Sequence, residues 1–109
     1  MKSHFVNYMM EREGAETIEN EKGFICYKFD DNYCIITDIY IAPEHRLNKI
    51  GRSFGEQVEE KAKEKGAKGI ICYADRNANN FTEATDFILK NDYKILNTSG
   101  SLIYFKKDL

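Results

Sequence analysis

Residues 35–55 read IITDIYIAPEHRLNKIGRSFG, and this stretch decides the fold that the chain is expected to adopt. It begins inside the apolar run 33–41, which is typical of a central strand covered on both faces. Pro43 cannot donate to a strand ladder, so the strand stops and a polar loop, 44–49, follows. A helix then begins at Ile50. A helix N-terminus in this position presents unpaired N–H groups that suit an anion, usually a phosphate.

Length and composition limit the possible classes of protein. The 109 residues predict one domain, 1–109, and they carry a net charge of −2 with 31% charged residues. Clustered lysines and arginines, which nucleic-acid binding needs, are not found, so no nucleic-acid partner is expected. No segment is long enough to span a membrane and no apolar signal core begins the chain, which predicts a cytoplasmic protein without a membrane partner. A monomer or a homodimer is expected.

The three cysteines predict buried, reduced thiols. Cys26, Cys34 and Cys72 each lie in an apolar, strand-like run. Their spacing does not match that of metal ligands, so no metal site is expected. Reduced thiols fit a cytosolic protein.

Hydrophobic patterning extends the expected structure on both sides of the opening stretch. The N-terminal part is expected to form a helix over 3–12 and strands over 17–20, 23–29 and 33–41. A helix over 50–65 and a strand over 68–74 follow. The chain is then expected to form a helix that is capped by Thr82 and runs to residue 90, and a hairpin of 93–96 and 101–106 with its turn at 97–100. Strand, helix and strand in the middle make a right-handed crossover with parallel strands. The fold class is therefore α+β: a mixed sheet with antiparallel N-terminal strands, one parallel β-α-β crossover, a short helix and a C-terminal hairpin. Such a sheet favours a ligand at the carboxyl ends of its parallel strands.

The loop lacks the GxxxxGK[ST] and GxGxxG patterns of nucleotide-binding loops. Residues 41–51, IAPEHRLNKIG, instead resemble motif A of the Gcn5-related N-acetyltransferases, the GNAT superfamily, in which V-x-P-x-x-R-x-x-G-x-G/A joins a strand to a helix. The apolar residue, proline, arginine and final glycine match in register, and Lys49 replaces the first glycine. Residues 84–93, ATDFILKNDY, resemble the family's second block, with Asp92 and Tyr93 in place of a glycine–aromatic pair.

The resemblance runs from about residue 23 to residue 105, and it implies acetyl-CoA as the co-substrate. Backbone amides over 47–52 would cradle the pyrophosphate, and Gly51 would let the diphosphate approach the main chain closely. The pantetheine arm would fill a gap between strands 33–41 and 68–74. Arg46 has the alternative role of fixing the loop through carbonyl groups. The resemblance thus implies that the cofactor is bound by Ile39, Tyr40, Ile41, Arg46, Leu47, Asn48, Lys49, Ile50, Gly51, Arg52, Asn79 and Asn80.

Acetyl transfer also needs a neutral amine and a proton for the leaving thiolate. Members of the family often place a tyrosine for the second task on the short helix, where this chain has Ile88. We therefore expect Tyr73 as the acid and Asp38 as the base. The alternatives are packing roles for Tyr40 and Tyr73 and local pairing for Asp38.

Three functions follow from these residues. The first is an N-acetyltransferase that moves acetyl from acetyl-CoA to a primary amine, either a protein lysine or N-terminus or a small amine. The second is a catalytically weak or inactive module of the same fold that binds CoA or serves in interactions. The third is an unrelated α+β domain whose loop binds no anion.

Overall fold

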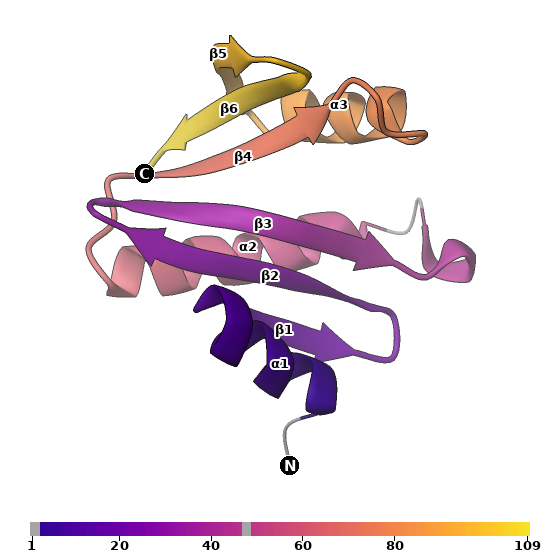
Figure 1. The fold of residues 1–109 in the computed structure, drawn as a ribbon, viewed down its shortest axis with the longest axis vertical. Helices are drawn as coiled ribbons and strands as arrows, with labels where there is room; N and C mark the ends of the chain where they lie inside the picture. Colours follow the sequence, from indigo (N-terminus) through magenta and orange to yellow (C-terminus); the bar gives the residue numbers. More distant parts are fainter. Residues whose placement is uncertain (1–2, 47–48) are drawn as a thin grey trace.

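The computed structural model describes residues 3–46 and 49–109, which form a six-stranded mixed sheet with three α-helices (Figure 1). In chain order the elements are α1 His4–Glu13, β1 Glu16–Asn20, β2 Gly23–Asp30, β3 Tyr33–Ile41, the 3-10 turn η1 Pro43–His45, α2 Ile50–Glu64, β4 Gly69–Asp75, α3 Phe81–Lys90, β5 Lys94–Ser99 and β6 Leu102–Asp108. The strand order is β1-β2-β3-β4-β6-β5. Among the described strands, β3 and β4 form the parallel pair. The predicted α+β class with one parallel crossover is confirmed.

Local signals account for most element ends. Ser3 caps α1 by accepting a hydrogen bond from the Val6 N–H at 3.2 Å, and Gly14 ends it at φ +65°. The expected cap of α3 at Thr82 is wrong. Phe81 N–H already donates to the Ala78 carbonyl at 3.2 Å, so the backbone turns earlier and Asn80 takes the cap position. The closing turn also lies later than predicted, because β5 continues to Ser99.

The sheet buries different residues on its two faces because side chains alternate along each strand. On one face, α2 and α3 pack against Ile25, Tyr27, Ile70 and Phe105 through Phe54, Val58, Ala62 and Ile88. On the other face, α1 packs Met9 against Cys26 and Phe24. Figure 1 shows α1 in front of β1 and β2, with α2 behind the sheet. The larger core therefore lies between the sheet and α2 and α3.

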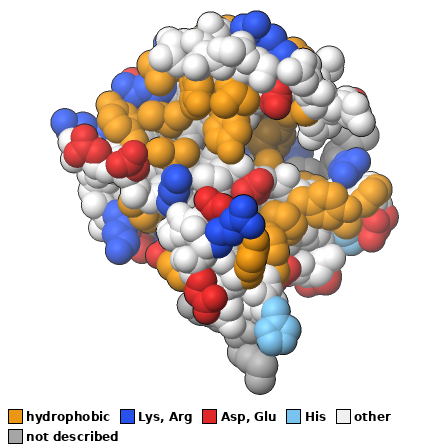
Figure 2. Space-filling model, viewed as in Figure 1, with side chains coloured by type: hydrophobic (Ala, Val, Ile, Leu, Met, Phe, Trp, Pro, Cys, Tyr) orange, Lys and Arg blue, Asp and Glu red, His pale blue; other side chains and the backbone are white. Residues whose placement is uncertain are grey.

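The expectation that β3 is covered on both faces is wrong. Asp38, Ile39 and Tyr40 are exposed near its C-terminal end, while Cys34 near its start is buried. Ile39 pairs with Ile25 on the α2 side, where it lines an open cavity. Asp38 and Tyr40 pair with Cys26 and Phe24 on the α1 face, where α1 packs on β1 and β2 and leaves the C-terminal end of β3 uncovered. Hydrophobic side chains consequently gather on the uncovered part of this face, as the upper half of Figure 2 shows.

The buried thiols make the free energy of unfolding depend on pH in the alkaline range. Burial raises the pKa of Cys34 and of Cys72 from 9.0 to about 12. Unfolding therefore releases two protons above pH 9, so the stabilisation is complete below pH 9 and is lost as the pH rises towards 12. We expect the free energy of unfolding to fall by about 1.4 kcal/mol per pH unit for each thiol in that window.

Urea unfolding at pH 8, 9.5 and 11 measures this dependence. Tyr27 and Tyr93 act in the same direction at higher pH, because burial raises the pKa of both. Cys72→Ala should reduce the pH slope by one proton. A free energy of unfolding that stays constant from pH 8 to pH 11 would contradict this account.

Candidate functional site

The parallel strands β3 and β4 separate soon after they begin. Their register runs from the pair Tyr33–Gly69 to the pair Ile35–Ile71 and then stops. Beyond that point β3 pairs with β2 as far as Ile41, and β4 pairs with β6. The facing edges of β3 and β4 are therefore released from their mutual ladder, and we call this opening the split.

A β-bulge lies where the split opens. In the β2–β3 ladder, Cys26 is opposite Asp38 and Tyr27 is opposite Ile36, so Thr37 is the extra residue. A bulge bends its strand and increases the local twist. The bulge thus explains why β3 turns away from β4 at this position.

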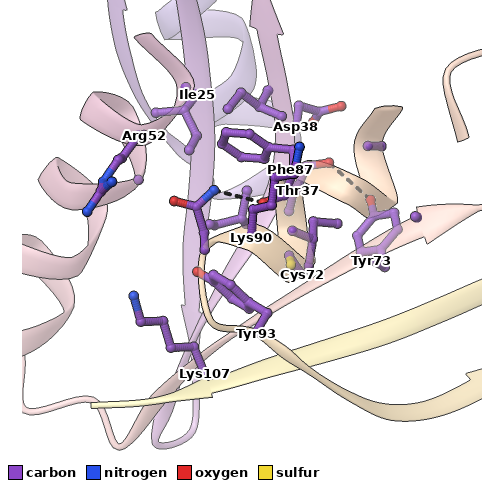
Figure 3. A pocket seen from close by; sticks show the side chains of 18 of the residues that line it. Ile25, Thr37, Asp38, Arg52, Cys72, Tyr73, Phe87, Lys90, Tyr93 and Lys107 are labelled. Atoms are coloured by element: carbon purple, nitrogen blue, oxygen red, sulfur yellow. Dashed lines mark hydrogen bonds between the residues drawn. The ribbon is translucent and has the colours of Figure 1, made fainter. Parts of the chain in front are cut away.

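The split opens into a cavity of about 520 Å³ beneath α2 and α3 (Figure 3). Its walls come from residues 36–39 of β3, residues 72–75 of β4, the first three turns of α2, and α3 with the residues that follow it. Strand edges, two helices and a helix N-terminus therefore meet in one concave site, which is the usual form of a small-molecule site.

The structure brings some of the expected residues together at this cavity. Both expected catalytic residues, Asp38 and Tyr73, line it, and so do Ile39, Gly51, Arg52 and Asn80. Six others lie outside the cavity lining: Tyr40, Ile41, Arg46, Lys49, Ile50 and Asn79. Leu47 and Asn48 lie outside the described residues. The expected set therefore combines wall residues with residues of the adjoining loop.

The first turn of α2 has the backbone form of an anion site. Lys49 is the N-cap residue, adopts φ +62° and makes no side-chain cap bond. The N–H groups of the first turn thus have no capping side chain from Lys49. A left-handed backbone costs a lysine about 1 kcal/mol more than a glycine. This explains physically why a glycine suits the position where the GNAT pattern has one.

Arg46 holds the loop against the end of β3. Its Nε donates to the Ile41 carbonyl at 2.9 Å, and its guanidinium lies 5.8 Å from the centroid of the Tyr40 ring. In this arrangement Arg46 fixes the loop through a carbonyl group.

Tyr73 spans the split. Its hydroxyl donates to the Thr37 carbonyl at 3.1 Å, the dashed bond at the right of Figure 3. Burial raises the pKa of Tyr73, and the nearby charge of Asp38 raises it further. The phenol is therefore protonated at neutral pH.

Gly51 lies against α3 as well as at the first turn of α2. A Cβ at this position would be 2.8 Å from the ring of Phe87. Gly51 thus permits α2 and α3 to approach each other closely beside the cavity. This packing role is additional to the close approach of a diphosphate that was expected from the sequence.

Several lining residues were missed from the sequence. Phe87 and the buried Ile88 belong to the block 84–93 and were available to pattern reasoning. The ion pair between Lys107 and Glu59, at 2.5 Å, could not be found from sequence patterns, because the two residues are 48 positions apart and only the fold brings them together. The remaining lining residues away from the strand edges include Lys90, Asn91 and Tyr93.

Within residues 3–46 and 49–109, no group of three or more His, Cys, Asp or Glu side chains is placed to hold a metal ion. No helix in the same ranges has the length and apolar character that crossing a membrane requires.

A mixed sheet whose parallel strands split beside a helix N-terminus defines an acetyltransferase-type fold. The family model "Acetyltransferase (GNAT) family" matches residues 7–87. The chain therefore belongs to the GNAT family, as its motif-A resemblance predicted. A search of curated proteins by sequence finds no match.

Solved structures give the same fold. The chain is 29% identical to PaiA N-acetyltransferase from Thermoplasma acidophilum, solved with coenzyme A, with a TM-score of 0.73 over 80% of this chain and 53% of that one. It is 26% identical to a protein of Bacillus anthracis assigned as a streptothricin acetyltransferase, solved with acetyl coenzyme A, with a TM-score of 0.70 over 81% and 56% of the two chains. The anti-CRISPR protein AcrVA5 is 22% identical, with a TM-score of 0.69 over 83% of this chain and 96% of that one. The chain thus spans about half the length of the first two proteins and nearly all of the third.

Proposed function

We propose that this protein is an N-acetyltransferase that moves the acetyl group of acetyl-CoA onto a primary amine. The observation that carries the proposal is the split between β3 and β4, which opens into a cavity of about 520 Å³ beside the first turn of α2. Family membership supports acyl transfer, and two similar proteins were solved with coenzyme A or acetyl coenzyme A.

The described residues fit the two parts of this co-substrate. The edge of β3 near Ile39 offers backbone groups to the amides of a pantetheine arm. The first-turn N–H groups after Lys49, which receive no cap from the Lys49 side chain, offer donors to the diphosphate, and Arg52, which pairs with Glu56 at 3.3 Å, lies at the cavity wall. The site therefore provides backbone donors at the helix N-terminus where the ligand carries acceptors and negative charge.

Acetyl transfer forms a C–N bond and breaks the C–S bond of the thioester. The acceptor nitrogen must lose a proton, and the leaving thiolate must gain one. Asp38 is the proposed base and Tyr73 the proposed acid. The Tyr73 hydroxyl now donates its single proton to the Thr37 carbonyl, so it must exchange that partner for the sulfur during the reaction.

The acceptor is proposed to be a protein lysine, a protein N-terminus or a small amine. A second function, coenzyme A binding without catalysis, is favoured by one observation. Ile88 is buried and lines the cavity at the position where the family often has a tyrosine that acts as the general acid. The side chain of isoleucine is a hydrocarbon, so it has no proton to donate to the thiolate.

Two assays separate these functions. Purified protein is incubated with acetyl-CoA and a panel of amines, and release of free thiol is followed, while a thermal shift with coenzyme A reports binding. Thiol release that depends on one of the amines supports the transferase. Binding without release with any amine supports the second function, and no thermal shift at millimolar coenzyme A would refute both.

Asp38→Asn is expected to lower kcat/KM for the amine by about 100-fold, the usual effect of removing a general base. Affinity for coenzyme A should change less than threefold, because the change keeps the side chain's size. Steady-state kinetics and calorimetry measure the two quantities. Asp86→Asn is the matched control, because Asp86 is exposed on α3 and outside the cavity lining. Equal activity of the Asp38 variant and the control would refute the role of Asp38.

A further inference from the structure

We propose that Tyr73 limits the length of the acyl chain that the site accepts, because its side chain closes the split between β3 and β4. This inference rests on the proposed function, since it requires the thioester of an acyl-CoA to reach the split. It adds a determinant of acyl specificity to the acid role proposed above.

A second hollow lies on the opposite face of the sheet, the face shown in Figure 2. It has a volume of about 430 Å³, and we call it the outer groove. Apolar or aromatic side chains supply most of its walls, namely Ile35, Ile71, Leu96 and Tyr104, and Lys28 and Asn97 add polar groups. The outer groove is thus suited to hydrocarbon and is not covered by α1.

Two residues, Thr37 and Tyr73, line both the cavity and the outer groove. The hydrogen bond between them crosses the split just beyond the last parallel pair, Ile35–Ile71. The Tyr73 ring lies 5.9 Å from the ring of Tyr104, which supports it from the side of the outer groove. The Tyr73 side chain, held at its hydroxyl and beside its ring, therefore lies with Thr37 between the two hollows.

This arrangement gives short and long acyl chains different environments. An acetyl group adds one methyl beyond the thioester carbonyl and can stop at the Tyr73 ring. A longer chain must displace the ring and break its bond to Thr37 before it reaches the outer groove. Without the ring the two hollows join, and each methylene that enters the apolar groove should strengthen binding about fourfold.

The test is calorimetric titration with acetyl-CoA, butyryl-CoA and hexanoyl-CoA, which needs no acceptor and no turnover. The wild-type protein should bind hexanoyl-CoA at least tenfold more weakly than acetyl-CoA. Tyr73→Ala should bind hexanoyl-CoA at least as tightly as acetyl-CoA, and Tyr73→Val, which suits a strand, provides the same measurement if the alanine variant does not fold.

Two variants act as controls. Leu96→Ala enlarges the outer groove without opening the wall, because Leu96 does not line the inner cavity, so its acyl preference should equal that of the wild type. Tyr73→Phe keeps the ring, so it should keep the preference for acetyl while losing the proton needed for transfer. A preference in Tyr73→Phe as relaxed as that in Tyr73→Ala would contradict the ring as the barrier.

The failure of this inference differs from failure of the proposed function. Normal binding of acetyl-CoA with an unchanged acyl preference in Tyr73→Ala overturns this inference alone. Equal affinity of the wild-type protein for hexanoyl-CoA and acetyl-CoA does the same. No binding of coenzyme A to the wild-type protein overturns the proposed function and this inference with it.

Discussion

Gly51→Trp is expected to weaken coenzyme A binding by at least about 100-fold. A Cβ alone at Gly51 would lie 2.8 Å from the Phe87 ring, so an indole must either displace that ring or fill the cavity. Either movement blocks the approach to the first turn of α2. A ligand at 100 times its dissociation constant stabilises a protein by about 2.7 kcal/mol, so the wild type should show a clear thermal shift that the variant lacks.

Gln57→Trp is the matched control for this change. Gln57 lies on the same helix, is exposed, and is outside the cavity lining, so the same indole should leave coenzyme A affinity unchanged. Circular dichroism would establish that both variants are folded. Wild-type affinity in a folded Gly51→Trp protein would refute the placement of the diphosphate at this turn.

Gly23→Ala is expected to destabilise the protein by about 3 kcal/mol. A Cβ at Gly23 would lie 2.0 Å from the Tyr40 carbonyl oxygen, a contact that backbone movement alone can relieve. Gly23 pairs with Ile41 at the end of the β2–β3 ladder, which holds the released part of β3 in place. For a domain of this size the loss corresponds to a fall in Tm of about 15 °C, measured by thermal unfolding.

Gly100→Ala provides the comparison for Gly23→Ala. Gly100 adopts φ +59° in the turn between β5 and β6, and a Cβ there would meet nothing within 4 Å. The cost is then limited to the left-handed backbone, about 1 kcal/mol, or about 5 °C in Tm. Equal shifts in the two variants would mean that the Tyr40 contact contributes nothing to the cost at Gly23.

Local sequence signals were sufficient for most of the fold. The apolar run before Pro43 predicted β3 with its observed bounds, Tyr33–Ile41, because proline cannot extend a ladder. The helix predicted over 50–65 is α2, Ile50–Glu64, and its buried residues Phe54, Val58 and Ala62 recur at the four-residue spacing of one helix face. The exposure of Ile39 and Tyr40 was not predicted, because an apolar run does not state whether a second layer covers it.

The candidate site was predictable only in part. The GNAT-like pattern located Gly51 and Arg52, since a strand, a loop and a helix N-terminus are consecutive in sequence. The hydrogen bond of Tyr73 to Thr37 joins residues 36 positions apart, and it depends on the bulge in β3 and on the place where the parallel ladder stops. Pairing between residues that are far apart in the chain leaves no periodic pattern in the sequence. The position of Tyr73 between the two hollows could therefore be found only from the structure.

A crystal structure of the protein with acetyl-CoA tests the central claim most directly. The account predicts the pantetheine arm in the split beside Ile39, the diphosphate at the first turn of α2, and the acetyl group against the Tyr73 ring. Acetyl-CoA bound elsewhere, with no part of it between β3 and β4, would contradict the account.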